Sequence, residues 1–197
     1  MDSNNKIKVI FIDGNISVGK STIIRKLSEG RDDIVSLTEP IKKFTLLDKF
    51  NSHVIENDEL KEILDYSFQL EVCVVIYNMI RKEITDPTKT YVVERNPYLR
   101  NIVFSADKNF GEEQRDTINY FNEMILKYMN EKFDYKTYFL DCDFEEKRKR
   151  LVERNKGNIP ESYHKTVDEN YRKYSDLINH ETIINIDTEK TVKLIKI

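Results

Sequence analysis

The chain has 197 residues, of which 34% are charged, 39% hydrophobic and 11% aromatic, and its formal net charge is −3. This length and balance fit one globular domain with a sizeable core and exclude a disordered chain. The small net charge gives no general electrostatic case for nucleic acid or membrane partners, and we expect neither. We find no signal peptide and no apolar run of membrane-spanning length, and we expect a cytoplasmic protein.

Cysteine and histidine usage gives no sign of a disulfide or of a metal site built by the protein alone. Cys73 and Cys142 are the only cysteines, and both lie in apolar stretches. We therefore expect reduced, buried thiols. The three histidines show no ligand spacing.

The predicted elements alternate between strands and helices. The apolar runs predict strands at 7–12, 34–38, 90–93, 137–141 and 182–187. The helical patterns cover 20–29, 59–82, 111–131, 145–154 and 161–178, and a short terminal helix follows the last strand. Residues 41–58 are weakly patterned, and we predict no structure there. The alternation predicts an α/β fold with a five-stranded parallel sheet and helices on both faces, in a single domain spanning residues 1–197.

The segment between the first strand and the first helix carries the clearest motif. It reads Gly-Asn-Ile-Ser-Val-Gly-Lys-Ser at residues 14–21 and fits G-x-x-x-x-G-K-[ST], the phosphate-binding P-loop. Backbone N–H groups and the helix N-terminus would hold the phosphates of a nucleotide such as ATP. Lys20 supplies a cation, and the Ser21 hydroxyl can ligate Mg²⁺. The alternative is a tight turn with a solvent-facing lysine, but pattern and context agree on the P-loop. The expected nucleotide-binding residues are Gly14, Asn15, Ile16, Ser17, Val18, Gly19, Lys20, Ser21 and Thr22.

Charged residues follow the second and third predicted strands. Glu39 comes after one, and Glu94 and Arg95 come directly after the other. Ligands of open α/β sheets bind at the carboxyl ends of the strands, so these side chains should gather beside the P-loop. Phosphoryl transfer to a hydroxyl needs a group that receives its proton and cations that stabilise the developing charge. Glu39 and Arg95 are candidates for these two roles.

Two polar features allow two interpretations from the pattern alone. Gln69 lies on the same helix face as several apolar residues. It either caps a backbone group in the core or binds a polar ligand edge, and the pattern favours neither. Arg150 and Arg154 share one face of a highly charged helix. They either form a closing lid over the site or belong to a solvated helix face.

Four segments in chain order, and a fifth weaker one, match a known family. The P-loop is close to G-N-I-x-x-G-K-[ST], and residues 38–44, Thr-Glu-Pro-Ile-Lys-Lys-Phe, are similar to E-P-x-x-x-[WF]. Phe68-Gln69 matches an F-Q pair, and residues 94–98, reaching Phe104, are similar to an E-R-S segment. The fifth match is an arginine lid at 150–160. In these motifs the chain resembles the deoxynucleoside kinases, the group of deoxycytidine, deoxyguanosine and mitochondrial-type thymidine kinases.

The resemblance implies a P-loop kinase fold and transfer of the γ-phosphate of ATP to the 5′-hydroxyl of a deoxynucleoside. It also implies Mg²⁺ as cofactor and a homodimer packed through long helices. Glu39 would be the catalytic base, and Arg95 would hold the 5′ end and the transferring phosphate. Ser21 and Glu94 would lie near Mg²⁺, while Arg150 and Arg154 would close over the donor phosphates.

The resemblance also implies substrate contacts. Gln69 would hydrogen-bond the nucleobase and Phe104 would stack on it, while Phe44 and Phe68 would form pocket walls. Ile76 and Arg100 stand where some members carry an arginine and an aspartate. Ile76 resembles the thymidine-accepting branch, whereas Arg100, in the substrate-binding set, fits neither branch.

Sugar recognition follows the family pattern less closely. A tyrosine that contacts the 3′-hydroxyl in the family is replaced by Asp58 at the ungapped position.

Two other functions remain alternatives. A thymidylate or other nucleoside-monophosphate kinase shares the fold but usually has an arginine just before Glu-Pro, where this chain has Thr38. A non-catalytic nucleotide-binding module would keep Lys20 and could lose the base, whereas Glu39, Arg95 and Ser21 are all present.

Overall fold

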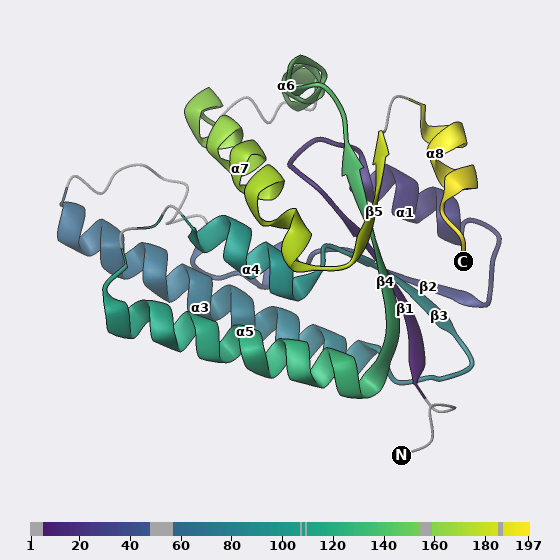
Figure 1. Cartoon of the computed structure of the whole chain (residues 1–197), viewed down its shortest axis with the longest axis horizontal. Coiled ribbons are helices and arrows are strands. Elements are labelled where there is room, and N and C mark those ends of the chain that lie inside the picture. Colours follow the sequence, from purple (N-terminus) through teal and green to yellow (C-terminus); the bar gives the residue numbers. More distant parts are fainter. Residues whose placement is uncertain (1–5, 48–56, 107, 109, 154–158, 185–186) are drawn as a thin grey trace.

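The computed structural model describes residues 6–47, 57–106, 108, 110–153, 159–184 and 187–197. The strands are β1 (Ile7–Asp13), β2 (Ile34–Leu37), β3 (Thr90–Glu94), β4 (Phe133–Asp141) and β5 (His180–Ile184). The α-helices are α1 (Lys20–Ser28), α3 (Asp58–Glu83), α4 (Pro97–Ser105), α5 (Glu112–Lys132), α6 (Phe144–Glu153), α7 (Glu161–Tyr174) and α8 (Thr188–Leu194), as labelled in Figure 1. The described residues also contain two short 3₁₀ turns, η2 (Ile41–Lys43) and η3 (Ser175–Leu177).

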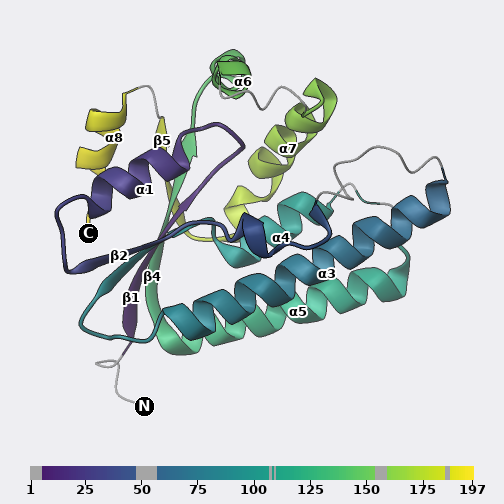
Figure 2. The same cartoon turned by 180° about the vertical axis from the view of Figure 1, so that it is seen from behind.

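The five strands form one parallel sheet in the order β2-β3-β1-β4-β5. β1 lies at the centre, and the P-loop leaves its carboxyl end (Figure 2). The five-stranded parallel sheet predicted from the sequence is confirmed.

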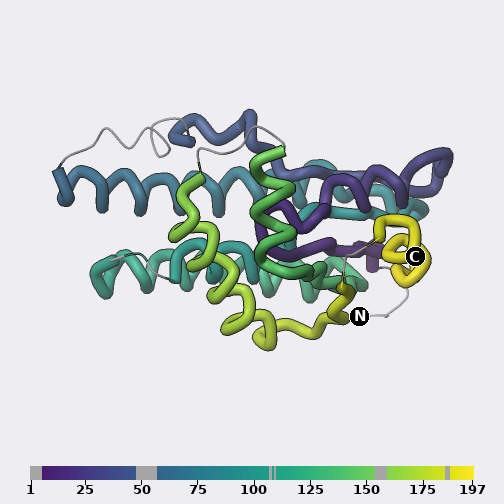
Figure 3. The backbone as a smooth tube through the Cα atoms, turned by 90° about the horizontal axis from the view of Figure 1, so that it is seen from above, coloured from purple at the N-terminus to yellow at the C-terminus, as the bar shows by residue number. Residues whose placement is uncertain are grey.

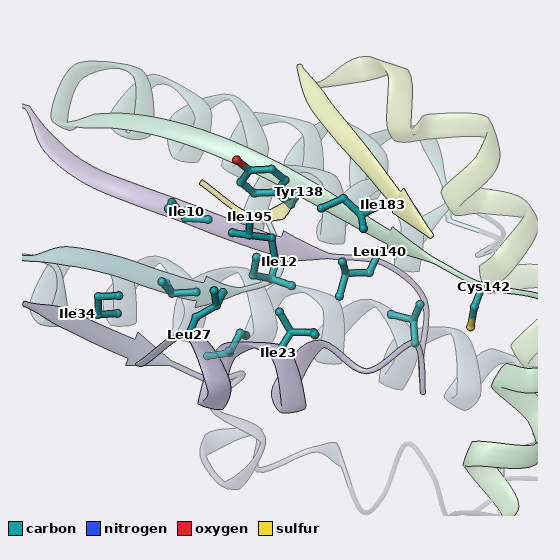
Figure 4. Close-up of a cluster of buried hydrophobic side chains, with 13 residues drawn as sticks. Ile10, Ile12, Ile23, Leu27, Ile34, Tyr138, Leu140, Cys142, Ile183 and Ile195 are labelled. Atoms are coloured by element: carbon teal, nitrogen blue, oxygen red, sulfur yellow. The ribbon is translucent and has the colours of Figure 1, made fainter. Parts of the chain in front are cut away.

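Alternate residues of β1 supply the cores on the two faces of the sheet. Ile10 and Ile12 pack with α1 and the chain end in the cluster drawn in Figure 4. Val9 and Phe11 pack with α3 and α5 on the other face. The strand is therefore apolar on both sides, as a central parallel strand between helical layers must be. Cys73 and Cys142 are free thiols and are buried, as expected.

Helices α3 and α5 lie side by side and extend together past the sheet (Figures 1 and 3). Asn57 caps α3, since its side chain accepts a hydrogen bond from Leu60 N. Within the described part of the chain, α3 is the single helix long and apolar enough to cross a membrane, although the sequence analysis found no such run. Only 39% of its apolar window is buried, and core helices of soluble proteins pass the same test.

The structure contains one helix that the sequence analysis missed. α4 begins at Pro97, and its N-cap Asn96 accepts hydrogen bonds from Tyr98 N and Leu99 N. An Asn-Pro pair is a helix-start signal that could have found it. The predicted span 161–178 ends as a 3₁₀ turn, β4 begins four residues early, and β5 is shifted toward the N-terminus. Pairing with β1 recruits the polar start of β4, which its own sequence does not favour.

Candidate active site

The P-loop has the backbone geometry that its glycines allow. Gly14 has φ +131° and Gly19 has φ +104°, both in the region that L-residues avoid. A Cβ on Gly14 would lie 2.3 Å from the carbonyl oxygen of Leu140, so only glycine fits beside β4. Ser17 also has a positive φ, of 63°. The loop thus folds tightly between β1 and α1, with Val18 buried in the core.

Lys20 is buried beneath the loop. Its Nζ donates to the carbonyl oxygens of Asn15, at 2.8 Å, and Gly14, at 3.1 Å. Burial and the nearby charge of Arg95 lower the pKa of Lys20 to about 7. Burial thus disfavours the ammonium form of Lys20, and a bound phosphate would stabilise it.

Helix α7 braces the P-loop through two successive turns. The Asn15 amide donates to Asp168 Oδ1 at 2.8 Å, and the same oxygen pairs with the buried Lys147 of α6. His164 contributes an Nε2 contact of 3.2 Å to the carbonyl oxygen of Ile16. The side chain of Asn15 is thus engaged with α7, while its carbonyl oxygen accepts from Lys20 Nζ. Sequence analysis did not identify this brace, since its residues come from three separate elements.

Glu39 lies between two arginines at the carboxyl end of the sheet. Its Oε2 accepts from Arg95 Nε at 3.1 Å, and its Oε1 accepts from Arg100 Nε at 2.8 Å. The Glu39 side chain is 12% exposed, and the arginines are 8% and 6% exposed. Burial alone would raise the pKa of Glu39, but the two arginines outweigh it and lower the pKa to about 2. Glu39 is therefore a carboxylate at neutral pH.

Arg95 connects the P-loop to Glu39. Its Nη1 donates to Gly14 O at 3.0 Å and to the Tyr171 hydroxyl at 2.7 Å. The Tyr171 hydroxyl in turn donates to Asp13 Oδ1 at 3.0 Å. Arg95 has φ +69°, a strained backbone conformation for a non-glycine residue. The surrounding contacts, including Arg95 N to Ile12 O, hold that conformation in place.

The expected substrate residues gather next to this carboxylate. The rings of Phe44 and Phe68 pack edge to face at 6.1 Å in a buried cluster that also contains Ile76. The Gln69 amide donates to Phe104 O at 3.4 Å, so in this state it caps a backbone group. The guanidinium of Arg95 lies 5.2 Å from the centre of the Phe104 ring. Arg100 and Phe104 meet here because they are four residues apart on α4.

The residues expected near Mg²⁺ also lie together. The Ser21 hydroxyl donates to Glu94, at 3.3 Å from each carboxylate oxygen. Magnesium prefers oxygen ligands and usually takes one or two from protein carboxylates, with substrate phosphates and waters completing its shell. No cluster of three or more acidic, histidine or cysteine ligands occurs among the residues that the structure describes. The hydroxyl and carboxylate therefore fit a magnesium ion carried in with the nucleotide.

A model of the deoxynucleoside kinase family matches residues 10–196. The chain belongs to the deoxynucleoside kinase family. As a member, it is an ATP-dependent kinase that phosphorylates a deoxynucleoside. No curated protein sequence matches it.

Solved structures of deoxyadenosine kinase from M. mycoides have the same fold. The structure with bound dATP is 15% identical with a TM-score of 0.70, and that with bound dCTP is 17% identical with a TM-score of 0.69. A third, with the products dCMP and a flexible dCDP bound, is 14% identical with a TM-score of 0.65. Each comparison covers 94% of this chain and 95% of the other.

One of the two arginines expected in the lid of this kinase lies at the P-loop. Arg150 Nη1 donates to Val18 O at 3.4 Å, and its Nε pairs with Glu146 at 2.8 Å. Its guanidinium therefore lies beside the loop. Arg154 lies outside the described residues.

The structure adds residues to the site that sequence analysis did not select. Asp13 and Tyr171 are both buried and contact Arg95 or the P-loop directly. Asp13 could have been suspected as a charged residue ending a buried strand. Tyr171 could not, because it follows the spacing of an ordinary core face of α7.

Proposed function

We propose that Glu39 is the base that receives the proton of the 5′-hydroxyl, while Arg95 and Lys20 stabilise the phosphoryl group in transit from ATP. The observation that carries the proposal is the contact chain from Glu39 through Arg95 Nε and Nη1 to Gly14 of the P-loop. It joins a carboxylate to the nucleotide loop through one guanidinium. A hydroxyl bound to Glu39 would then meet the phosphate at Arg95.

The low pKa of Glu39 is compatible with this role. A carboxylate with a pKa of about 2 is a weak base in the free enzyme. Phosphoryl transfer passes through a loose transition state, in which positioning and charge stabilisation dominate and the proton leaves late. The Glu39 carboxylate therefore orients the hydroxyl first and takes its proton as the new bond forms.

Ser21 and Glu94 would hold Mg²⁺ with the phosphates. When bound, the metal would supply positive charge that neutralises the phosphates. The Ser21–Glu94 hydrogen bond sets these two ligands at the mouth of the P-loop beforehand. Arg150 and Arg154 are proposed to contact the donor phosphates from the lid.

The acceptor pocket is proposed to consist of Gln69 and Arg100 with the aromatic residues Phe44, Phe68 and Phe104. Gln69 would exchange its bond to Phe104 O for a nucleobase edge, which its amide can read as donor or acceptor. Phe104 would stack on the base.

We also propose a cytoplasmic, single-domain homodimer that assembles through α3 and α5. Leu60, Ile63 and Val74 on α3 are 56%, 52% and 43% exposed, and Tyr120 on α5 is 63% exposed. An apolar face of this kind commonly marks an interface between protomers. Sedimentation velocity of the purified protein tests it: a monomer at micromolar concentration would contradict the dimer.

A phosphoryl-transfer assay tests the reaction itself. The enzyme is incubated with ATP, Mg²⁺ and one acceptor at a time. The acceptors are the four deoxynucleosides and thymidine monophosphate. We expect a 5′-monophosphate from at least one nucleoside. Phosphorylation of thymidine monophosphate alone would identify the enzyme as a nucleotide kinase. Absence of phosphorylation of all five acceptors would favour a non-catalytic nucleotide-binding module.

A further inference from the structure

Arg100 has a hydrogen-bonding group that the fold leaves unused. Its Nε is bound to Glu39 Oε1 at 2.8 Å, and the residue is 5% exposed. Its Nη1 is buried and has no hydrogen-bond partner among the described residues. A buried donor without a partner costs about 1–3 kcal/mol, and such groups in native proteins call for an explanation.

The guanidinium that carries this group lies among aromatic side chains of the site. The Arg100 guanidinium is 5.0 Å from the centre of the Phe104 ring and 5.8 Å from that of Phe44. Its charge also acts on Cys73, one helical turn after Gln69 on α3. These are the neighbours expected around a nucleobase. Arg95 also lies beside Phe104, at 5.2 Å from the ring centre, but its Nη1 donates to Gly14 O of the P-loop.

An arginine in this position restricts which ligand atoms can bind to it, whereas a glutamine does not. A glutamine amide can rotate to present either an oxygen or an N–H group, whereas a guanidinium only donates and stays charged. A ligand atom that meets Nη1 must therefore be an acceptor. An exocyclic amino group placed there would leave two donors facing each other.

We propose that Arg100 determines base specificity by donating from Nη1 to a carbonyl oxygen of the nucleobase. The enzyme then favours bases with an oxo group at pyrimidine position 4 or purine position 6, as in uracil, thymine and guanine, over cytosine and adenine, which carry an amino group there. The proposal rests on the proposed function, since it takes the acceptor pocket beside Glu39 as the nucleoside site. Under this proposal the enzyme disfavours deoxyadenosine.

Matched substrate pairs test the preference directly. Deoxyuridine and deoxycytidine differ in an oxo or an amino group at position 4 and in the proton that N3 carries beside the oxo group. Deoxyinosine and deoxyadenosine differ in the same way at position 6. We expect kcat/KM of the wild-type enzyme to favour the oxo member of at least one pair by about tenfold or more. Dissociation constants from titration calorimetry for the same four nucleosides should follow the same order.

Two variants assign the preference to Arg100. Arg100→Met keeps an unbranched stem and removes the donors, so the oxo-to-amino ratio should fall to within about threefold of one. Arg115→Met is the matched control, because that guanidinium bonds only the backbone carbonyls of Phe110 and Lys108 among the described residues. Its ratio should equal that of the wild type.

The outcomes separate this proposal from the proposed function. Equal or better use of deoxycytidine and deoxyadenosine by the wild type would overturn the role of Arg100. An unchanged ratio in Arg100→Met would overturn it as well. Absence of turnover with every nucleoside would contradict the proposed function, and the wild-type dissociation constants would still decide the base preference. If Arg100→Met does not fold, the oxo-to-amino ratios of kcat/KM and of the dissociation constants of the wild type test the proposal.

Discussion

The donor and acceptor sides of this site are built in different ways. The core of the proposed donor side is one continuous segment, residues 14–22, in which Lys20 Nζ bonds the carbonyl oxygens of the loop. The proposed acceptor side joins Glu39 after β2, Gln69 on α3, Arg95 after β3 and Phe104 on α4. A continuous loop can be recognised from its spacing, whereas a pocket made of four segments depends on how the helices pack. Single substitutions should therefore impair the use of ATP or the use of the nucleoside, but not both.

The largest expected effect is on the acceptor side. Glu39→Gln removes the carboxylate that receives the proton, and kcat should fall by about 10²- to 10⁴-fold. The dissociation constant of ATP should change little, because the P-loop is untouched. Steady-state kinetics and ATP titration measure the two quantities. Glu181→Gln, which removes an exposed carboxylate paired with Lys136, is the control and should keep full activity. Near-normal turnover of Glu39→Gln would remove it as the base.

The complementary change is on the donor side. Lys20→Ala removes the cation beneath the P-loop, and kcat/KM for ATP should fall by about 100-fold. Nucleoside binding, measured by calorimetry without ATP, should stay within about threefold of the wild type, since Lys20 bonds only P-loop carbonyls among the described groups. Unchanged kinetics with ATP would contradict the P-loop assignment. Equal losses in both measurements would contradict the separation of the two sides.

The carboxylate between two arginines also predicts a pH effect on stability. The pKa of Glu39 is lowered from 4.5 to about 2 in the folded protein. Its stabilising contribution is therefore present above pH 4.5 and is lost as the pH falls from 4.5 toward 2. Urea unfolding of the wild type and Glu39→Gln should show their difference in unfolding free energy shrinking by about 2 kcal/mol from pH 5 to pH 3. A difference independent of pH would contradict the paired state of Glu39.

The smallest expected effect concerns the residue that joins the two sides. Tyr171→Phe removes the hydroxyl that bridges Arg95 Nη1 and Asp13. We expect kcat to fall by about three- to tenfold, with KM for the nucleoside nearly unchanged, because Arg95 loses one of its orienting contacts. Tyr174→Phe, one turn along α7, is the matched control and should leave kcat unchanged. A lower melting temperature of Tyr171→Phe with unchanged kcat would show that Tyr171 contributes only to packing.

The sequence by itself determined the five strands, the helices other than α4, the parallel sheet and the P-loop, because these depend on local periodicity and on glycines that permit unusual φ values. It also indicated that Glu39, Glu94 and Arg95 would meet, because carboxyl ends of parallel strands share one edge. The tertiary structure decided what each side chain touches. Asp13, Asp168 and Tyr171 joined the site, and Glu39 acquired a second arginine, through contacts across long sequence separations. No spacing rule encodes such contacts, because the packing of α4 and α7 against the sheet creates them.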